Sequence, residues 1–192
     1  MKKFLAVIAI AALLCALALP AAAAAAITPQ NAAFAAEVLR LTNAERARHG
    51  LPALSGTNTA LNNAAQRRAV EINTYWSHTR PNGTPWHTVL TEFPVGARSL
   101  AGENLGRRQT SPAQVVQGWM NSPGHRANIL GQFTHLGVGV YRNSAGVYHW
   151  AQLFINDGSV PVDTGFNLWR SLLSALRFLA FILSFGLFIL PF

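Results

Sequence analysis

The sequence predicts a single α+β domain in which helices come first and an antiparallel hairpin follows. Apolar residues recur at helical spacing through two long segments near the start, and two short alternating segments separated by a glycine-containing turn lie near the end. Because no strand pattern alternates with the helices, this order differs from the strand–helix–strand repeats of parallel α/β proteins. The part expected to fold is residues 28–165, a length that suits one hydrophobic core.

Capping and turn residues set the bounds of the expected elements. Thr28 and Pro29 predict the start of the first helix, because threonine caps a helix and proline suits its first position, and Gly50 predicts its end. Helices are expected over residues 29–49, 59–76, part of 85–93, a segment from Pro112 through Trp119, and 123–130. Strands are expected over residues 136–141 and 148–154, and residues 77–102 are expected to be mostly loop. Gly137 and Gly139 fall on one face of the first strand, where a helix or another strand could pack closely.

Both ends of the chain are strongly apolar and are expected to lie outside the domain. Residues 1–26 combine two lysines, an apolar run and small residues suited to cleavage, which indicates a signal peptide; an uncleaved membrane anchor is the alternative. Residues 166–192 predict a hydrophobic helix that spans or lies on a membrane, with packing on the domain or on a second copy as the alternative. The only cysteine, Cys15, would be removed with a signal peptide, leaving no disulfide and no cysteine metal ligand.

The chain is basic, with a formal net charge of +8, and its only lysines are Lys2 and Lys3. The arginines are spread along the sequence and no nucleic-acid-binding motif accompanies them, so we expect a basic soluble surface and no nucleic-acid partner. The sequence also lacks HExxH, GxSxG, P-loop and complete GxGxxG patterns. Their absence argues against the zinc-protease, serine-hydrolase and nucleotide-binding classes that carry them.

Six short motifs follow one another in a fixed order through the domain. They are residues 41–46 (LTNAER), 77–83 (SHTRPNG), 101–105 (AGENL), 118–130 (GWMNSPGHRANIL), 136–140 (LGVGV) and 150–154 (WAQLF). Together they make the chain resemble the CAP superfamily of cysteine-rich secretory, antigen 5 and pathogenesis-related proteins, and in particular its bacterial branch. The resemblance covers residues 34–154 and implies a three-layer α-β-α sandwich with a cleft across one face.

The resemblance places two histidines and one glutamate in this cleft. His78, Glu103 and His125 stand where the family carries such residues, and Ser122 stands where it normally carries a second glutamate. Two imidazoles and a carboxylate match the set of ligands in open zinc sites, so a bound zinc or another divalent metal is one hypothesis. A hydrogen-bonded cluster that only ties loops together is the other.

Neighbouring polar residues are expected to support this cluster. Asn104 and Arg126 flank the site residues in sequence and are expected to brace the loops, and Gln152 lies on a strand that could end beneath the cleft. His125 is expected in the first turn of its helix, where the positive helix end disfavours its protonated form. The tryptophans of the domain are expected in the core or the cleft wall, although an exposed one could bind sugar or lipid.

Three functions stay open from the sequence, and it does not decide whether the protein is an enzyme. The first is an exported, extracytoplasmic binding module, secreted, periplasmic or in the cell envelope and held at the membrane by its tail, whose cleft binds a lipid, a small ligand or a cell-wall component. The second is a metal-dependent hydrolase that uses His78, Glu103 and His125, with Glu103 as a third ligand or as the base for a bound water. The third is a structural envelope protein with no active cleft. Ser122 in place of a carboxylate favours the first and the third over the second.

Overall fold

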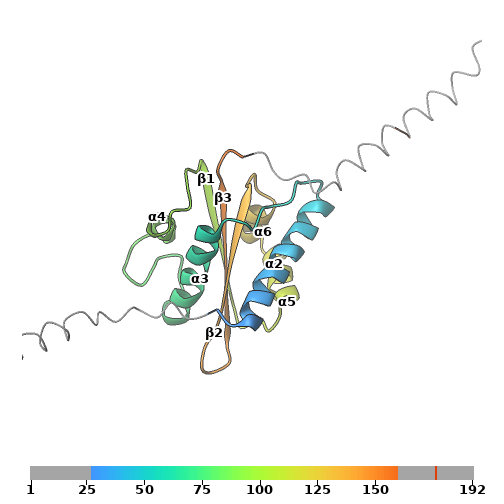
Figure 1. Cartoon of the computed structure of the whole chain (residues 1–192). Coiled ribbons are helices and arrows are strands. Elements are labelled where there is room, and N and C mark those ends of the chain that lie inside the picture. Colours follow the sequence, from blue (N-terminus) through green and yellow to red (C-terminus); the bar gives the residue numbers. More distant parts are fainter. Residues whose placement is uncertain (1–26, 160–175, 177–192) are drawn as a thin grey trace, which may run out of the picture.

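A small antiparallel sheet forms the centre of the domain (Figure 1). The computed structural model describes residues 27–159 and residue 176. The strands are β1 (Leu100–Arg107), β2 (His135–Arg142) and β3 (Tyr148–Asn156). Their order in the sheet is β1-β3-β2, so β3 is central and β1 pairs with another strand along one edge only.

Helices cover both faces of the sheet, so the domain has the three layers that the family resemblance implied (Figure 1). The helices are α2 (Pro29–Arg48), α3 (Thr59–Thr74), the 3-10 helix η1 (Trp86–Thr88), α4 (Val89–Glu92), α5 (Pro112–Met120) and α6 (Pro123–Ile129). Apolar residues of α2, α5 and α6 pack against Trp150 and Phe154 of β3. Those of α3 and α4 pack against Leu153 and Ile155, which alternate with Trp150 and Phe154 and therefore face the other way.

The predicted start and end of α2 are confirmed, because each is marked by a characteristic capping residue. The Thr28 hydroxyl accepts a hydrogen bond from the Asn31 backbone N–H at 3.1 Å, which caps α2. Gly50 follows the end of α2 with a φ of 72°, a conformation that favours glycine. The helix predicted for residues 59–76 ends earlier, at Thr74, because Tyr75 is already extended.

The sequence prediction was wrong for β1, because residues up to Gly102 were expected to be loop and only two strands were expected. β1 is buried on both faces from Gly102 to Gly106 and therefore lacks the polar–apolar alternation of a half-exposed strand. Two glycines and the pair Glu103–Asn104 further disguise it. This strand carries the central glutamate of the predicted site, so the omission matters for function.

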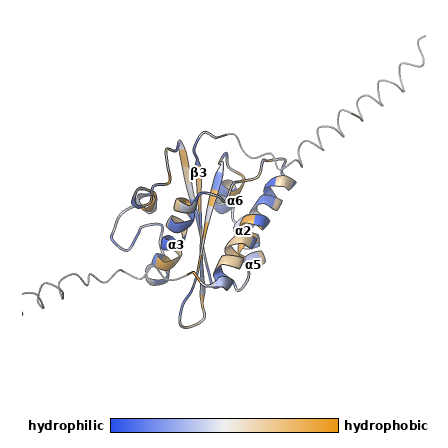
Figure 2. Ribbon diagram, in the orientation of Figure 1, coloured by the Kyte–Doolittle hydropathy of each residue, from blue (hydrophilic) through white to orange (hydrophobic). Residues whose placement is uncertain are grey.

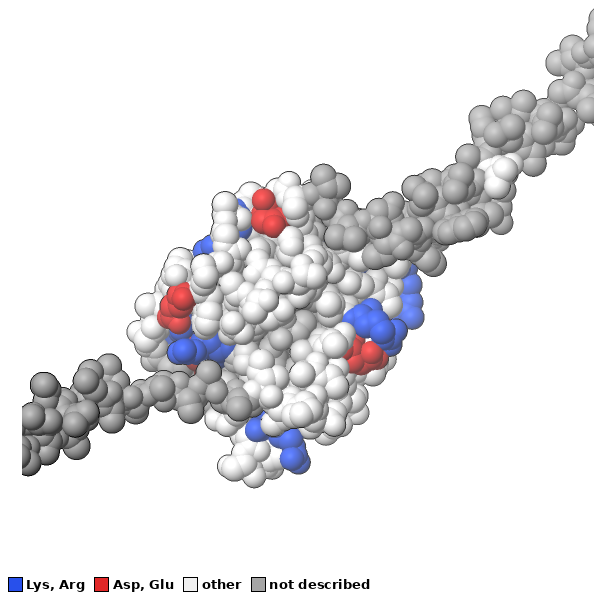
Figure 3. Space-filling model, in the orientation of Figure 1, with Lys and Arg blue, Asp and Glu red and all other residues white. Residues whose placement is uncertain are grey.

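Charged and apolar residues are distributed as expected for a folded soluble domain. Figure 2 shows hydrophobic and hydrophilic residues on different sides of the same helices. On the face drawn in Figure 3, acidic and basic side chains occur in small adjacent groups rather than in one patch. Glu37 and Arg40 on α2 form an exposed ion pair, with 2.6 Å between the carboxylate and the guanidinium.

The predicted signal peptide (1–26) lies outside the described residues, as does the predicted membrane tail (166–192) except for residue 176. The predicted domain end at residue 165 also lies beyond the last continuous described residue. Within the described part of the chain, no helix has both the length and the apolar character needed to cross a bilayer.

The prediction that Gly137 and Gly139 allow close packing is confirmed. A Cβ atom added at Gly139 would lie 2.1 Å from the Ala65 carbonyl oxygen, and one at Gly137 would lie 2.5 Å from the Leu61 carbonyl oxygen. These neighbours are backbone atoms of α3, which cannot move aside as a flexible side chain can. The two glycines therefore set how closely α3 approaches the sheet.

We predict that Gly139→Ala lowers the free energy of unfolding by about 3 kcal/mol, because the added methyl group would force α3 away from β2. Chemical denaturation measures this. Gly118→Ala is the matched control, since Gly118 is exposed on α5 and has no neighbour nearer than 4.0 Å to an added Cβ. It should be neutral or stabilising by up to about 1 kcal/mol. Equal stability of the two variants would contradict the packing account.

Candidate functional site

The candidate site is built on β1, whose successive side chains point to opposite faces of the sheet. Glu103 pairs with Leu153 and shares its face, the face covered by α3. Asn104 pairs with Gln152 and faces α6. Because β1 is an edge strand, groups on both of its faces can come together beside it. We use the name His78–His125 site for the side chains of His78, Glu103 and His125.

Glu103 is held on its face by two partners. The Arg68 Nε donates to Glu103 Oε2 at 2.7 Å, and His78 Nδ1 lies 2.7 Å from Glu103 Oε1. The Arg68 and Glu103 side chains are almost completely buried, whereas the His78 ring is 59% exposed. A carboxylate only accepts hydrogen bonds, so Nδ1 of the neutral His78 ring carries the proton and Nε2 does not.

The Arg68–Glu103 pair continues into a chain of ion pairs that fixes the segment carrying His78. Arg68 Nη1 contacts Glu71 at 2.7 Å, and Arg68 Nη2 donates to the Ser77 carbonyl at 2.9 Å, next to His78. Arg80, itself buried, contacts Glu71 at 2.6 Å and reaches Glu92 on α4. Although burial raises the pKa of Glu71, hydrogen bonds from Arg80 and Arg68 outweigh it and hold the pKa below its usual value.

On the other face of β1, Asn104 holds the backbone that carries His125. Its Nδ2 donates to the His125 carbonyl at 3.0 Å and to Gln152 Oε1 at 3.1 Å. Its Oδ1 accepts from Asn128 Nδ2 at 2.9 Å, and the buried Gln152 donates in turn to Thr42 of α2 at 2.8 Å. Asn104 thus contacts the backbone that carries His125, and Gln152 contacts Asn104 from the neighbouring strand.

The far end of α6 is fixed from α2. Arg46, which is 1% exposed, donates from Nη1 to the carbonyls of Ile129 and Gly131 at 2.8 and 2.7 Å. These are acceptors at a helix C-terminus that have no intrahelical partner. Burial lowers the pKa of Arg46 to about 10. α6, and His125 with it, is thus tied at one end to β1 and at the other to α2.

The two histidines have opposite titration tendencies. The hydrogen bond to Glu103 raises the pKa of His78, outweighing the effect of its partial burial. Burial lowers the pKa of His125, and the charge of nearby His78 lowers it further. At near-neutral pH the pair is therefore asymmetric, with His78 more readily protonated than His125.

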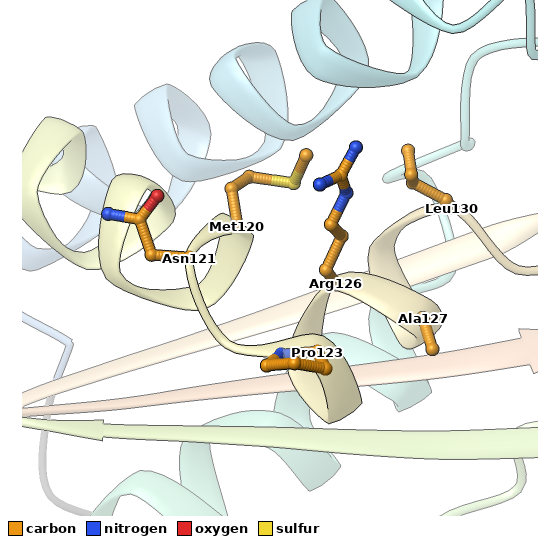
Figure 4. A pocket seen from close by; sticks show the side chains of 6 residues that line it. All are labelled: Met120, Asn121, Pro123, Arg126, Ala127 and Leu130. Carbon is orange, nitrogen blue, oxygen red and sulfur yellow. The ribbon is translucent and has the colours of Figure 1, made fainter.

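Two of the predicted neighbours do not contact the Glu103 cluster. Ser122 is the N-cap of α6, but its hydroxyl makes no capping hydrogen bond. Arg126 points toward α2, where its Nη2 lies 3.2 Å from His49 Nε2 (Figure 4). There it lines a cavity of about 360 Å³ together with Met120, Asn121, Pro123, Ala127 and Leu130.

Arg68, Arg80 and Asn128 also support the site, although they were not among the residues predicted from the sequence. Arg68 could have been found, because it falls three residues after Ala65 and four before Ile72 on the apolar stripe of its helix. A charged residue in that position needs a buried partner. Nothing in the sequence marks Asn128, whose contacts depend on how α6 packs on β1.

Comparison with known proteins decides the family. Residues 39–154 match the profile of the cysteine-rich secretory protein family, CAP. The chain belongs to the CAP family. It is 40% identical to the Bacillus subtilis protein YkwD over 126 residues, which is 64% of this chain and 47% of YkwD. It is 35% identical to the Bacillus subtilis membrane protein YlbC over 108 residues, which is 55% of this chain and 31% of YlbC. The chain thus spans less than half of either relative.

Solved structures agree with the assignment to the CAP family. An extracellular protein with an SCP domain from Bacillus anthracis superposes with a TM-score of 0.60 at 34% identity, over 68% of this chain and 44% of that protein. A cysteine-rich secretory protein from Staphylococcus aureus superposes with a TM-score of 0.56 at 20% identity, over 67% of this chain and 40% of that one. The three-layer arrangement of this CAP domain is therefore that of known relatives.

We predict that Arg68→Met lowers the free energy of unfolding by about 3–5 kcal/mol, because it leaves the buried Glu103 carboxylate without its cation. The neighbouring Arg67 is exposed on the same helix, so Arg67→Met should change stability by no more than about 0.5 kcal/mol. Thermal or urea denaturation of both variants makes the comparison. If the Arg68 variant were as stable as the Arg67 variant, the buried ion pair would not be holding the site.

Proposed function

We propose that this protein is an extracytoplasmic binding module whose ligand contacts the His78–His125 site. The observation that supports this most is the placement of an exposed imidazole, His78, over a buried and fully engaged carboxylate. An arrangement that only tied loops together would not need an exposed ring aimed at that carboxylate. The bound component is a lipid, a small ligand or a cell-wall component.

A divalent metal such as zinc fits two imidazoles better than the full set of three side chains. His78 Nε2 is free and His125 favours its neutral form, which is the form that binds metals. Glu103 would support the metal from behind His78, as carboxylates commonly do for metal-binding histidines. Among the described residues, no three His, Cys, Asp or Glu side chains are grouped to hold one ion. A ligand group or water would complete the coordination.

The hydrolase alternative receives less support from the same geometry. Both oxygens of Glu103 are already engaged, one by Arg68 and one by His78, which leaves it poorly placed to take a proton from water. Ser122 offers no second carboxylate. The proposed role therefore remains binding, with no catalytic step assigned to these residues.

Export is part of the proposal. The apolar and positively charged start of the sequence is typical of a signal peptide. One relative is described as extracellular and another as a membrane protein. On this proposal the C-terminal segment, residues 166–192, holds the domain at the outer face of the membrane.

We predict that the full chain binds one zinc ion at near-neutral pH and that His78→Ala/His125→Ala abolishes this binding. Isothermal titration calorimetry and metal analysis after dialysis measure it. His87→Ala is the control, because His87 is also exposed but lies outside the site. Should the double variant retain zinc, or the wild-type chain bind none, the metal part of the proposal is wrong and binding would rest on the protein groups alone.

A further inference from the structure

An exposed tryptophan and an arginine lie together at one end of β1. Trp76 is 45% exposed, and the Arg107 guanidinium carbon lies 4.9 Å from the centre of its ring. Tryptophan is usually largely buried in a soluble domain, so a half-exposed ring held by a cation indicates a contact surface. Tyr75, the preceding residue, is also 50% exposed.

This pair is aligned with the His78–His125 site. Trp76 precedes His78 by two residues in the segment that follows α3, and Arg107 follows Glu103 by four residues on the same face of β1. With a rise of about 3.3 Å per strand residue, the two positions on β1 are separated by about 13 Å. His78 over Glu103 and Trp76 over Arg107 thus form two contacts between the same pair of segments.

Arg107 has unused binding capacity. Within residues 27–159, its guanidinium makes no salt bridge or side-chain hydrogen bond. The carboxylate on the same strand, Glu103, is buried and is already bound by Arg68 and His78. The planar donors of Arg107 are therefore available to an external carboxylate, which they match in a bidentate geometry.

The surroundings favour a sugar over an acyl chain. A cavity of about 300 Å³ is lined by residues that flank Trp76 in the sequence, namely Thr74, Tyr75, Thr79, Arg80, Pro81 and Gly83. Its lining combines an aromatic ring with the three hydroxyl groups of Thr74, Tyr75 and Thr79 and contains no aliphatic Leu, Ile or Val. An aromatic face beside hydroxyl donors suits the C–H faces and hydroxyls of a sugar ring.

We propose that Trp76 and Arg107 form a subsite for a carboxylated sugar unit of a glycan ligand. The Trp76 ring contacts the C–H face of the sugar, and Arg107 binds its carboxylate. This inference rests on the proposed binding function, because it names the ligand class that the His78–His125 site would share.

The test uses the full chain and a tetramer of galacturonic acid, with the methyl ester of the same tetramer as a probe that lacks the carboxylate charges. Isothermal titration calorimetry should show binding of the acid and at least about ten-fold weaker binding of the ester. Arg107→Gln and Trp76→Ala should each weaken binding of the acid by about ten-fold or more. Arg142→Gln is the matched control, because Arg142 also lies over an aromatic ring, Tyr148, at 5.6 Å. It should leave binding unchanged.

The proposal is overturned if the acid does not bind, if the ester binds equally well, or if Arg107→Gln has no effect. Zinc binding by the same variants separates this failure from failure of the proposed function. Arg107→Gln should keep zinc at His78 and His125. If zinc is bound and the glycan is not, the subsite is wrong and the His78–His125 site stands.

Discussion

The buried ion pair between Arg68 and Glu103 is the interaction on which the rest of the site depends. It places a guanidinium 2.7 Å from a carboxylate whose side-chain exposure is only 1%. That carboxylate orients His78, and the same arginine holds the Ser77 carbonyl beside it. Through Glu71 and Arg80 the interaction extends to Glu92, so a loop with little regular structure is fixed by charge rather than by a hydrophobic core. Removing one partner of such a pair costs far more than the pair adds to stability, because the other charge remains buried.

The edge position of β1 explains how residues far apart in the sequence form one site. Consecutive residues of a strand face opposite ways, so Glu103 supports His78 from the α3 layer while Asn104 supports His125 from the α6 layer. A central strand would keep these two groups apart with a neighbour on each side. Arg46 and Asn128 complete the arrangement by fixing both α6 and the backbone of β1. The two histidines, whose pKa values are shifted in opposite directions, are thus held by β1 and α6 in an arrangement that suits the binding of a ligand.

The parts of the fold and of the site that could be predicted from the sequence are those that residues close together in the sequence determine. Thr28 and Gly50 act through their own backbone or immediate capping contacts, and their predictions are confirmed. Gly139 was predicted as well, because a glycine on one face of a strand indicates close packing even before its partner, α3, is known. The three site residues could be named because the motifs around them resemble a family, although their roles stay a proposal. β1 was missed because a strand buried on both faces has no alternation. The burial of Arg68 was readable from its place on the apolar stripe of α3, but its partners, like those of Arg80, are set by tertiary packing that a linear pattern does not reveal.

The central claim is that Glu103, held by Arg68, raises the pKa of His78 above the ordinary value of 6.5, whereas burial lowers the pKa of His125 below it. NMR titration of the histidine side chains in the wild-type protein and in Glu103→Gln tests it most directly. The account predicts a pKa above 6.5 for His78 and below 6.5 for His125, with the His78 value falling toward 6.5 in Glu103→Gln. Because the folded-state pKa of His78 is raised, its contribution to stability is complete below pH 6.5 and is lost as the pH rises through that raised value. A wild-type His78 that titrates at or below 6.5, or one whose pKa does not change in Glu103→Gln, would contradict the account.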